Sequence, residues 1–387
     1  MKKTWVALAV AGAFVAGTAQ AQSSVTLYGI LDVNYMWEEK PTTVGTGTAT
    51  RVVQESGSAI NSGHQSGNRW GLRGSEDLGG GMKAIFTVEG GFDLDRGTLG
   101  QSSSASAPSG RLFGRQAWVG LESGWGSVVA GRLATFSSGT GSFDMFGRTD
   151  PFATGFGLAS LGQTFYSANA LRVDNAIAYV SPTWAGFKGG IGYSTRIDGA
   201  ETNPTSSNTQ AFIAGANWSA GPFWIGVTYD AVDFADATPQ RADQKHLQVG
   251  ATFDIGPVRL HGGYANQSNI SAIGVGGGAG SFIPIPSQLP SYDNNSFMAG
   301  VTWKLGAFTL LGSYQWSGAD GQSYTTVPGG PVFNFDPDFS IFGIGGTYNL
   351  SRRTNLYASY AARNADGTLL DNSFNYKQLA VGVRHLF

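Results

Sequence analysis

The sequence contains no cysteine and little charge. None of its 387 residues is Cys, and only 13% are Asp, Glu, Lys or Arg. Without cysteine there is neither a disulfide nor a thiol nucleophile, so the stability of the fold must come from its secondary structure. The formal net charge of −2 excludes the broadly basic surface with which proteins bind nucleic acids. We therefore expect no nucleic-acid partner.

Long apolar runs are also missing, apart from one at the amino terminus. Lys2 and Lys3 precede an apolar run over residues 5–16, which is followed by the small-residue sequence Ala19-Gln20-Ala21. These three parts are typical of a secretory signal peptide, here residues 1–21 with cleavage after Ala21. The alternative, a membrane anchor, requires about 20 apolar residues, and this run is shorter. A helical inner-membrane protein is thus excluded, and residues 22–387 show no linker that divides them into several domains.

Histidines are few and scattered. The four are His64, His246, His261 and His385, and none stands in an HExxH motif or at i, i+4 spacing from another. We therefore expect no metal and no cofactor. An outer-membrane enzyme with a Ser or Asp/His site assembled in space is the main alternative from another functional class.

Residues 69–92 contain two alternating runs on either side of an acidic, glycine-rich break at residues 76–81. Successive side chains of a strand point to opposite faces, so each run is apolar on one face and polar on the other. Runs of about ten residues match the length of a tilted strand that crosses a bilayer. The pattern predicts a hairpin of a membrane barrel. The polar face carries Arg69, Arg73, Lys83, Thr87 and Glu89; the apolar face carries Trp70, Leu72, Ala84, Phe86 and Val88.

The hairpin recurs along the whole chain, with short and long breaks in alternation, as in outer-membrane barrels. We count about sixteen strands, an even number that permits closure of an up-and-down sheet. The fold expected is therefore all-β: a 16-stranded antiparallel transmembrane barrel. The expected strands are 25–37, 69–75, 82–92, 112–122, 127–133, 175–180, 187–195, 210–219, 223–233, 244–253, 258–266, 296–304, 308–317, 339–349, 355–362 and 374–387.

Long loops and aromatic residues complete the pattern. Residues 38–67, 97–110, 195–209, 266–295 and 318–338 are expected to be long loops at one rim of the barrel. Aromatic residues recur near strand ends, and as a set they fit the interfacial girdles of membrane barrels. They are Tyr193, Trp218, Tyr229, Trp303, Trp316, Tyr348, Tyr357 and Tyr376.

These motifs resemble those of the general porins of Gram-negative outer membranes, in particular the beta-proteobacterial type. The matching segments are SSVTLYGILD (23–32), NRWGLRGSEDLGGGMKAIFTVEGGF (68–92), LFGRQAWVGL (112–121), GSVVAGR (126–132), NAIAYVSPTWAGF (175–187) and VGVRHLF (381–387). The resemblance implies a trimeric diffusion channel with one pore per subunit. It also implies that Phe387, with alternate apolar residues before it, is the signal read by the outer-membrane assembly machinery.

The break at about residues 134–173 is far longer than ordinary connections. It is apolar, with Phe136, Phe143, Met145, Phe146, Phe152, Phe156 and Phe165. A loop of this composition should be packed, and the space available is the barrel interior. The resemblance implies a third outer loop that folds inward and narrows the channel.

The expected constriction combines charges from this loop and from the wall. The loop supplies Asp144, Arg148 and Asp150, although turn or capping chemistry is an alternative role for the two acids. On the wall, Arg69, Arg115 and Arg172 match the constriction arginines of the family, and Arg132 and Arg73 are further candidates. The alternative for each arginine is a solvated charge away from the narrowest point.

We thus expect an outer-membrane channel for ions and small hydrophilic solutes, with a preference for anions because arginines outnumber acids at the constriction. Its expected partners are these solutes, outer-membrane lipid and lipopolysaccharide, the assembly machinery and two further copies in a homotrimer. A substrate-specific channel of the same barrel type is the alternative within this class.

Overall fold

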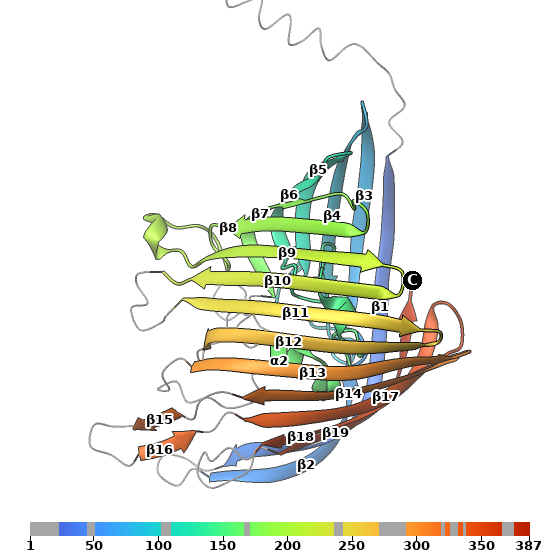
Figure 1. Cartoon of the computed structure of the whole chain (residues 1–387), viewed down its shortest axis with the longest axis vertical. Helices are drawn as coiled ribbons and strands as arrows, with labels where there is room; N and C mark the ends of the chain where they lie inside the picture. The colour runs from blue at the N-terminus through green and yellow to red at the C-terminus, as the bar shows by residue number, and fades with distance from the viewer. Residues whose placement is uncertain are drawn as a thin grey trace, which may run out of the picture.

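The chain forms a closed barrel of antiparallel strands with further segments inside it (Figure 1). The computed structural model describes residues 23–44, 51–101, 110–165, 171–235, 243–270, 292–318, 322–325, 332–335, 338–365 and 375–387. Across these residues, no helix has both the length and the apolar character required to cross a membrane.

Nineteen strands and four short helices make up the described structure. The strands are β1 (Ser24–Val44), β2 (Arg51–Ser62), β3 (Arg69–Gly79), β4 (Met82–Gly91), β5 (Gln116–Ser123), β6 (Gly126–Ala134), β7 (Arg172–Val180), β8 (Phe187–Ser194), β9 (Gln210–Ala220), β10 (Phe223–Asp233), β11 (Gln244–Ile255), β12 (Val258–Ile270), β13 (Tyr292–Leu305), β14 (Phe308–Gly318), β15 (Gln322–Thr325), β16 (Val332–Phe335), β17 (Phe339–Asn349), β18 (Thr354–Ala365) and β19 (Tyr376–Leu386). The helices are η2 (Gly147–Thr149), η3 (Gly157–Ala159), α2 (Gly162–Phe165) and η4 (Thr205–Ser207).

The barrel closes between its first and last strands. Residues 30–39 of β1 pair with β19, while the opposite edge of β1 pairs with β3 through residues 24–30 and with β2 through residues 33–44. Strands β2 and β3 therefore occupy one position in the wall. The sheet of seventeen strands is a barrel of sixteen, as predicted, and the β15–β16 hairpin lies outside it.

The terminal residue completes this seam. Gly29 and Phe387 exchange two backbone hydrogen bonds, each of 3.1 Å. A Cβ atom on Gly29 would lie 2.3 Å from the Phe387 ring. Glycine at this position lets the aromatic ring pack against the neighbouring strand.

The inner and outer faces of the wall carry different side chains, and β14 shows the pattern. Leu310, Tyr314 and Trp316 are exposed on the outer face, whereas Ser313 and Gln315 are buried on the inner face. This arrangement, with apolar side chains outside and polar ones inside, is the reverse of a soluble protein and typical of a membrane barrel. The outer face meets lipid, and the inner face lines the lumen.

Residues 38–67 are not the long loop that the sequence led us to expect. Strand β1 continues to Val44, and β2 forms a long hairpin arm with it. Polar residues follow one another in this arm, as in Glu38-Glu39-Lys40 of β1 and Gln54-Glu55-Ser56 of β2, so both faces carry polar side chains there. The alternation that identifies a membrane strand is therefore absent there.

Two of the predicted girdle residues point into the barrel. Tyr357 and Tyr376 are each only 4% exposed, and their hydroxyls donate to Asp32 (2.6 Å) and Glu38 (2.8 Å) respectively. Both alternate with outward residues, such as Leu356 beside Tyr357. The prediction was wrong for these two residues. It relied on their position near a strand end and not on the alternation of inward and outward side chains along the strand.

The apolar belt makes a direct prediction for stability. Val227 lies at the middle of β10 on the outer face, and Val227→Arg should lower the free energy of unfolding by about 2–4 kcal/mol, because the charge must enter the centre of the bilayer. As a control, Ile255→Arg at the turn end of β11 should cost about 1 kcal/mol or less. Urea unfolding in lipid vesicles measures both. Equal losses would contradict the assigned membrane belt.

Candidate functional site in the barrel interior

The segment between β6 and β7 packs against the inner face of the wall. Three apolar clusters hold it there, and each joins aromatic residues of the loop to a different group of strands. Phe136 and Met145 pack with Val129 and Ile213; Phe152, Phe156 and Leu158 pack with Leu311, Ile341 and Tyr357; Phe146, Leu161 and Phe165 pack with Ala265 and Met298. Strand β6 ends at Ala134 and β7 begins at Arg172.

Polar side chains of the wall satisfy the backbone of this loop. The Gln315 amide donates to the carbonyl of Ala159 at 2.8 Å. Gln267 and Ser296 both donate to the carbonyl of Thr164, at 2.8 and 2.9 Å. Buried backbone groups without partners are costly, so these contacts fix where the loop lies.

Arginines stand in a row on the wall on the other side of the loop. Arg69 lies at the start of β3, Arg115 directly before β5, Arg132 near the end of β6 and Arg172 at the start of β7. The charges of Arg69, Arg115 and Arg132 all act on Arg172. The structure thus brings four of the five predicted wall arginines together.

Glu89 of β4 lies within this row. Its carboxylate accepts a hydrogen bond from the Arg115 Nε at 2.6 Å and another from the Tyr28 hydroxyl at 2.9 Å. Arg115 and Glu89 are almost completely buried. A buried ion pair of this kind holds its partners in place, since either charge alone would be left uncompensated.

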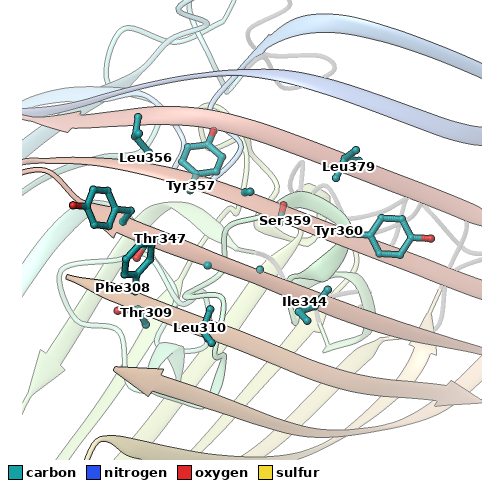
Figure 2. Close-up of a pocket in the computed structure, with 14 residues that line it drawn as sticks. Phe308, Thr309, Leu310, Ile344, Thr347, Leu356, Tyr357, Ser359, Tyr360 and Leu379 are labelled. Atoms are coloured by element: carbon teal, nitrogen blue, oxygen red, sulfur yellow. The ribbon is translucent and has the colours of Figure 1, made fainter. Parts of the chain in front are cut away.

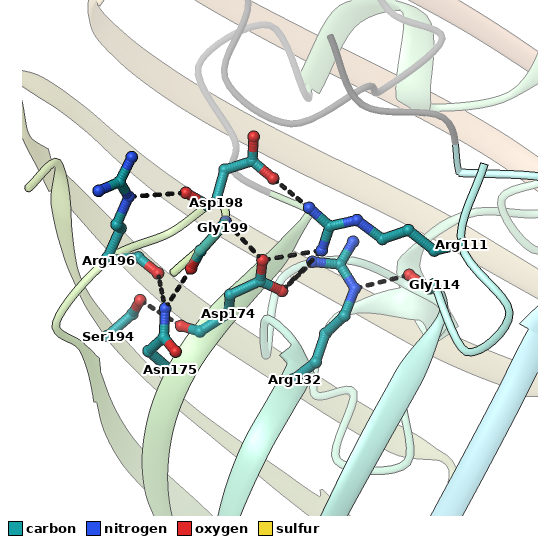
Figure 3. Close-up of polar contacts among 9 residues, drawn as sticks. All are labelled: Arg111, Gly114, Arg132, Asp174, Asn175, Ser194, Arg196, Asp198 and Gly199. Atoms are coloured by element: carbon teal, nitrogen blue, oxygen red, sulfur yellow. Dashed lines mark hydrogen bonds and ion pairs between the residues drawn. The ribbon is translucent and has the colours of Figure 1, made fainter. Parts of the chain in front are cut away.

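Asp174 joins the end of the row to neighbouring loops (Figure 3). Arg111 donates to both of its carboxylate oxygens, at 2.9 and 2.8 Å. Arg132 forms a second salt bridge with Asp174, and Arg111 forms another with Asp198. Arg111, Asp174 and Glu89 did not enter the predicted site. Arg111 stands four residues before Arg115, and Asp174 stands two residues after Arg172. These even spacings place each of them on the same side of the chain as a predicted arginine, and they could have identified both residues.

Arg69 and Arg172 have no such partner. Within the part of the chain that the structure describes, neither forms a salt bridge with a carboxylate. The Arg69 Nε donates to the Gly67 carbonyl at 3.0 Å, and the Arg172 Nε is buried without a hydrogen bond. The row therefore carries a surplus of positive charge.

An opening of about 230 Å³ lies between the loop and Arg172. Arg172 and His64 line it from the wall side, and hydroxyl and amide side chains line it from the loop, namely Ser138, Thr140, Thr154, Ser160 and Gln163. The loop side of the opening is thus neutral among the residues that line it.

The two loop acids bind the backbone of their own loop. Asp144 accepts N–H bonds from Gly139 at 2.7 Å and Gly147 at 2.8 Å. Burial raises the pKa of the Asp144 carboxyl, and the backbone donors oppose this rise.

Asp150 is bound in the same way. It accepts N–H bonds from Phe152, Thr154 and Leu161 at 2.8, 2.9 and 3.0 Å. Burial raises the pKa of this carboxyl to about 6, against the effect of these bonds. Both carboxylates therefore perform the turn chemistry that the sequence left open as their alternative role.

The remaining two predicted residues lie elsewhere. Arg148 forms a salt bridge with Asp254 at 3.1 Å and thereby ties the loop to β11. Arg73 is exposed on β3, with its guanidinium 5.3 Å from the centre of the Tyr28 ring. No cluster of three metal-ligating side chains occurs among the described residues.

The fold and the charged interior together define a membrane-spanning β-barrel with a polar lumen. A family model described as Gram-negative porin matches residues 7–368. Over 100% of both chains, the sequence is 34% identical to an outer membrane porin protein of Bordetella pertussis and 30% identical to outer membrane porin protein 32 of Delftia acidovorans. The solved structure of the anion-selective porin from Comamonas acidovorans has a TM-score of 0.67 at 24% identity, with 95% of this chain and 100% of that chain covered.

The chain belongs to the Gram-negative porin family. It is a β-barrel of the outer membrane through which ions and small hydrophilic solutes diffuse. The short turns of such barrels face the periplasm and the long loops face outward.

The hydrogen bonds of Asp150 generate a prediction for the loop. In Asp150→Asn one acceptor oxygen is replaced by an amide that cannot accept N–H bonds, and each lost bond to a charged group costs about 1.5–3 kcal/mol. Amide hydrogen exchange of residues 150–165 should become at least tenfold faster, while the barrel strands keep their protection. Asp93→Asn, in an exposed turn, is the control. Unchanged exchange in Asp150→Asn would show that this carboxylate does not hold the loop.

Proposed function

We propose that the arginine row, Arg69, Arg115, Arg132 and Arg172, forms one wall of the channel constriction and gives the pore a preference for anions. The observation that carries this proposal is the surplus of charge: Arg69 and Arg172 have no carboxylate partner among the described residues, and the facing loop side of the opening is neutral. Guanidinium groups stay ionised, and Arg172 lines the opening while the other three stand beside it in the row, so the row attracts anions and repels cations. A structural neighbour is named as an anion-selective porin, in agreement with this proposal.

The loop residues have a different role in this proposal. Asp144 and Asp150 shape the constriction because they fix the turns of the loop, and Arg148 anchors the loop to the wall through Asp254. The selectivity then comes from the wall alone. Neither Asp144 nor Asp150 lines the opening beside Arg172, so neither carboxylate borders the path that this proposal assigns to the solute.

The test is the reversal potential of the refolded protein in a planar bilayer under a neutral-pH salt gradient. Arg69→Ser and Arg172→Ser should each lower the anion-to-cation permeability ratio several-fold. A unit charge about 8 Å from a passing ion changes its energy by about 0.5–2 kcal/mol for effective dielectric constants between 80 and 20. An unchanged ratio in both variants would remove these arginines from the constriction.

Two further variants separate charge from structure. Arg115→Ser combined with Glu89→Gln removes a paired cation and anion, so the ratio should change little although the wall has lost an arginine. Arg96→Ser, in an exposed turn where Arg96 pairs with Asp93, should leave the ratio unchanged. If the double variant lowers the ratio as much as Arg172→Ser does, net charge is not the cause of the selectivity.

We further propose a homotrimer in contact with outer-membrane lipid and lipopolysaccharide, as the porin family suggests. The same recordings then show closures in thirds of the full conductance. We propose Phe387 as the signal read by the assembly machinery, which must bind it before the barrel closes, since the ring packs on Gly29 in the folded protein.

We propose that residues 1–21 are a signal peptide. The mature protein should then begin at Gln22, because the Ala19-Gln20-Ala21 sequence offers small residues to the signal peptidase. The intact mass of protein purified from outer membranes measures the cleavage site. A mass that includes Met1 would contradict this proposal.

We propose a passive channel rather than an enzyme. Asp230, His246 and Ser137 lie together in the interior, but the Ser137 hydroxyl donates to Asp230 and not to the imidazole. A serine nucleophile needs the histidine as its base, so this grouping does not activate one. A substrate-specific channel remains the alternative, and saturable block of the conductance by one class of solute would favour it.

A further inference from the structure

The outer face of the barrel has an apolar groove over β14, β17 and β18 (Figure 2). Its volume is about 520 Å³. Phe308 and Leu356 stand at one end of the groove, and Ile344, Tyr360 and Leu379 stand at the other (Figure 2). All of these side chains point outward and are between 36% and 53% exposed.

The groove exists because one row of the wall has small residues. The strand register aligns Phe308, Tyr348 and Leu356 in one row, and Leu310, Gly346 and Ala358 in the next outward row, so the small residues of that row lie on β17 and β18. Gly312, Ile344, Tyr360 and Leu379 form the row after that. A floor of glycine and alanine between two rows of large side chains leaves a channel across the surface. The Phe308 and Tyr348 rings contact each other at 4.4 Å between centroids and close the turn end.

The position of the groove fits one leaflet of the membrane. From Arg353 to Tyr360 the chain advances about 23 Å along the strand at about 3.3 Å per residue. A strand tilted by roughly 40° reduces this to about 18 Å along the membrane normal, close to half of a hydrocarbon core about 30 Å thick. The groove therefore opens in the leaflet next to the short turns, which is the periplasmic leaflet.

Two arginines stand at the turn end of this groove. Arg352 and Arg353 occupy the turn between β17 and β18, and both are exposed. Within the described part of the chain, no carboxylate forms a salt bridge with either of them. The turn between β3 and β4 differs, since acidic residues surround Lys83, which pairs with Glu122 at 4.0 Å. A pair of unneutralised arginines at a membrane surface attracts anionic headgroups.

We propose that this groove and the arginine pair together bind an anionic glycerophospholipid of the periplasmic leaflet. One acyl chain lies in the groove over Gly346 and Ala358, and the phosphate lies against Arg352 and Arg353. The site selects by charge at the turn and by shape in the groove. It lies outside the barrel, so it does not depend on the constriction.

The test is native mass spectrometry of the whole protein, refolded and then equilibrated with equimolar phosphatidylglycerol, phosphatidylethanolamine and lipid A in mild detergent. The wild-type protein should retain phosphatidylglycerol in preference to the other two. Arg352→Ser and Arg353→Ser should each lower its retention roughly five-fold, the effect of one basic residue near an anionic surface. Lys83→Ser, at another short turn, should have no effect.

The groove needs its own pair of variants. Ala358→Leu fills the floor and should lower retention of phosphatidylglycerol, whereas Ala362→Leu, on the same face of the same strand but outside the groove lining, should not. Single-channel conductance should stay at the wild-type value in all these variants, which shows that the barrel has folded.

Three results would overturn the proposal. The first is equal retention of phosphatidylglycerol and phosphatidylethanolamine by the wild-type protein. The second is a preference for lipid A that the arginine substitutions reduce, because this would place the site in the other leaflet. The third is a change of oligomeric state in Ala358→Leu, because this would make the groove an interface between copies of the chain.

Discussion

The structure depends on one constraint: in lipid, every backbone N–H and C=O of the wall must find a partner within the protein. Strand β1 meets this constraint at the seam, because it pairs with β19 on one edge and with both β2 and β3 on the other. The last residue contributes too, through the reciprocal bonds between Gly29 and Phe387. Closure leaves no free edge, and it fixes the register by which every other strand directs its side chains in or out.

The same register makes the wall a support for the loop. Inward side chains such as Gln315 and Ser296 are polar because they face a lumen, and their donors meet the carbonyl groups of the inward loop. Apolar side chains of the loop meanwhile fill the space between them, with Phe152 and Phe165 fully buried. A polar wall alone would leave an open pore, and an apolar loop alone would have nothing to bind. The packing of the loop against the wall depends on both.

Much of this fold was accessible from the sequence, because alternation reports the two faces directly wherever one face meets lipid. Alternation predicted the sixteen strands of the wall. The high phenylalanine content of the segment between β6 and β7 predicted a packed loop there. Alternation failed for residues 38–67, where consecutive polar residues in both strands of the hairpin arm interrupt it. The prediction for Tyr357 was wrong for another reason: its place near a strand end was weighed above the alternation, which puts it inside, next to the outward Leu356.

The roles of charges were harder to predict, because they depend on partners from other strands. In the sequence, Asp144 and Asp150 cannot be distinguished from acids that face the wall. Only the path of the loop shows that they accept hydrogen bonds from its backbone N–H groups. Glu89 was placed on the polar face, yet its pairing with Arg115 requires the register of β4 against β5. The sequence pattern therefore suggests which arginines face the interior, whereas the structure is needed to see which of them pair with a carboxylate.

The pairing with carboxylates lets the arginine row be stable and still keep a net positive charge. Four guanidinium groups held together in a protein wall repel one another and lose much of their hydration. Glu89 and Asp174 offset this cost at Arg115 and Arg132, each with a further donor, Tyr28 or Arg111, on the same carboxylate. Had every arginine received its own acid, the wall would be stable and neutral. Because Arg69 and Arg172 lie beside these pairs and form no salt bridge with a carboxylate of the described residues, the wall keeps its structure while the row retains a surplus of positive charge.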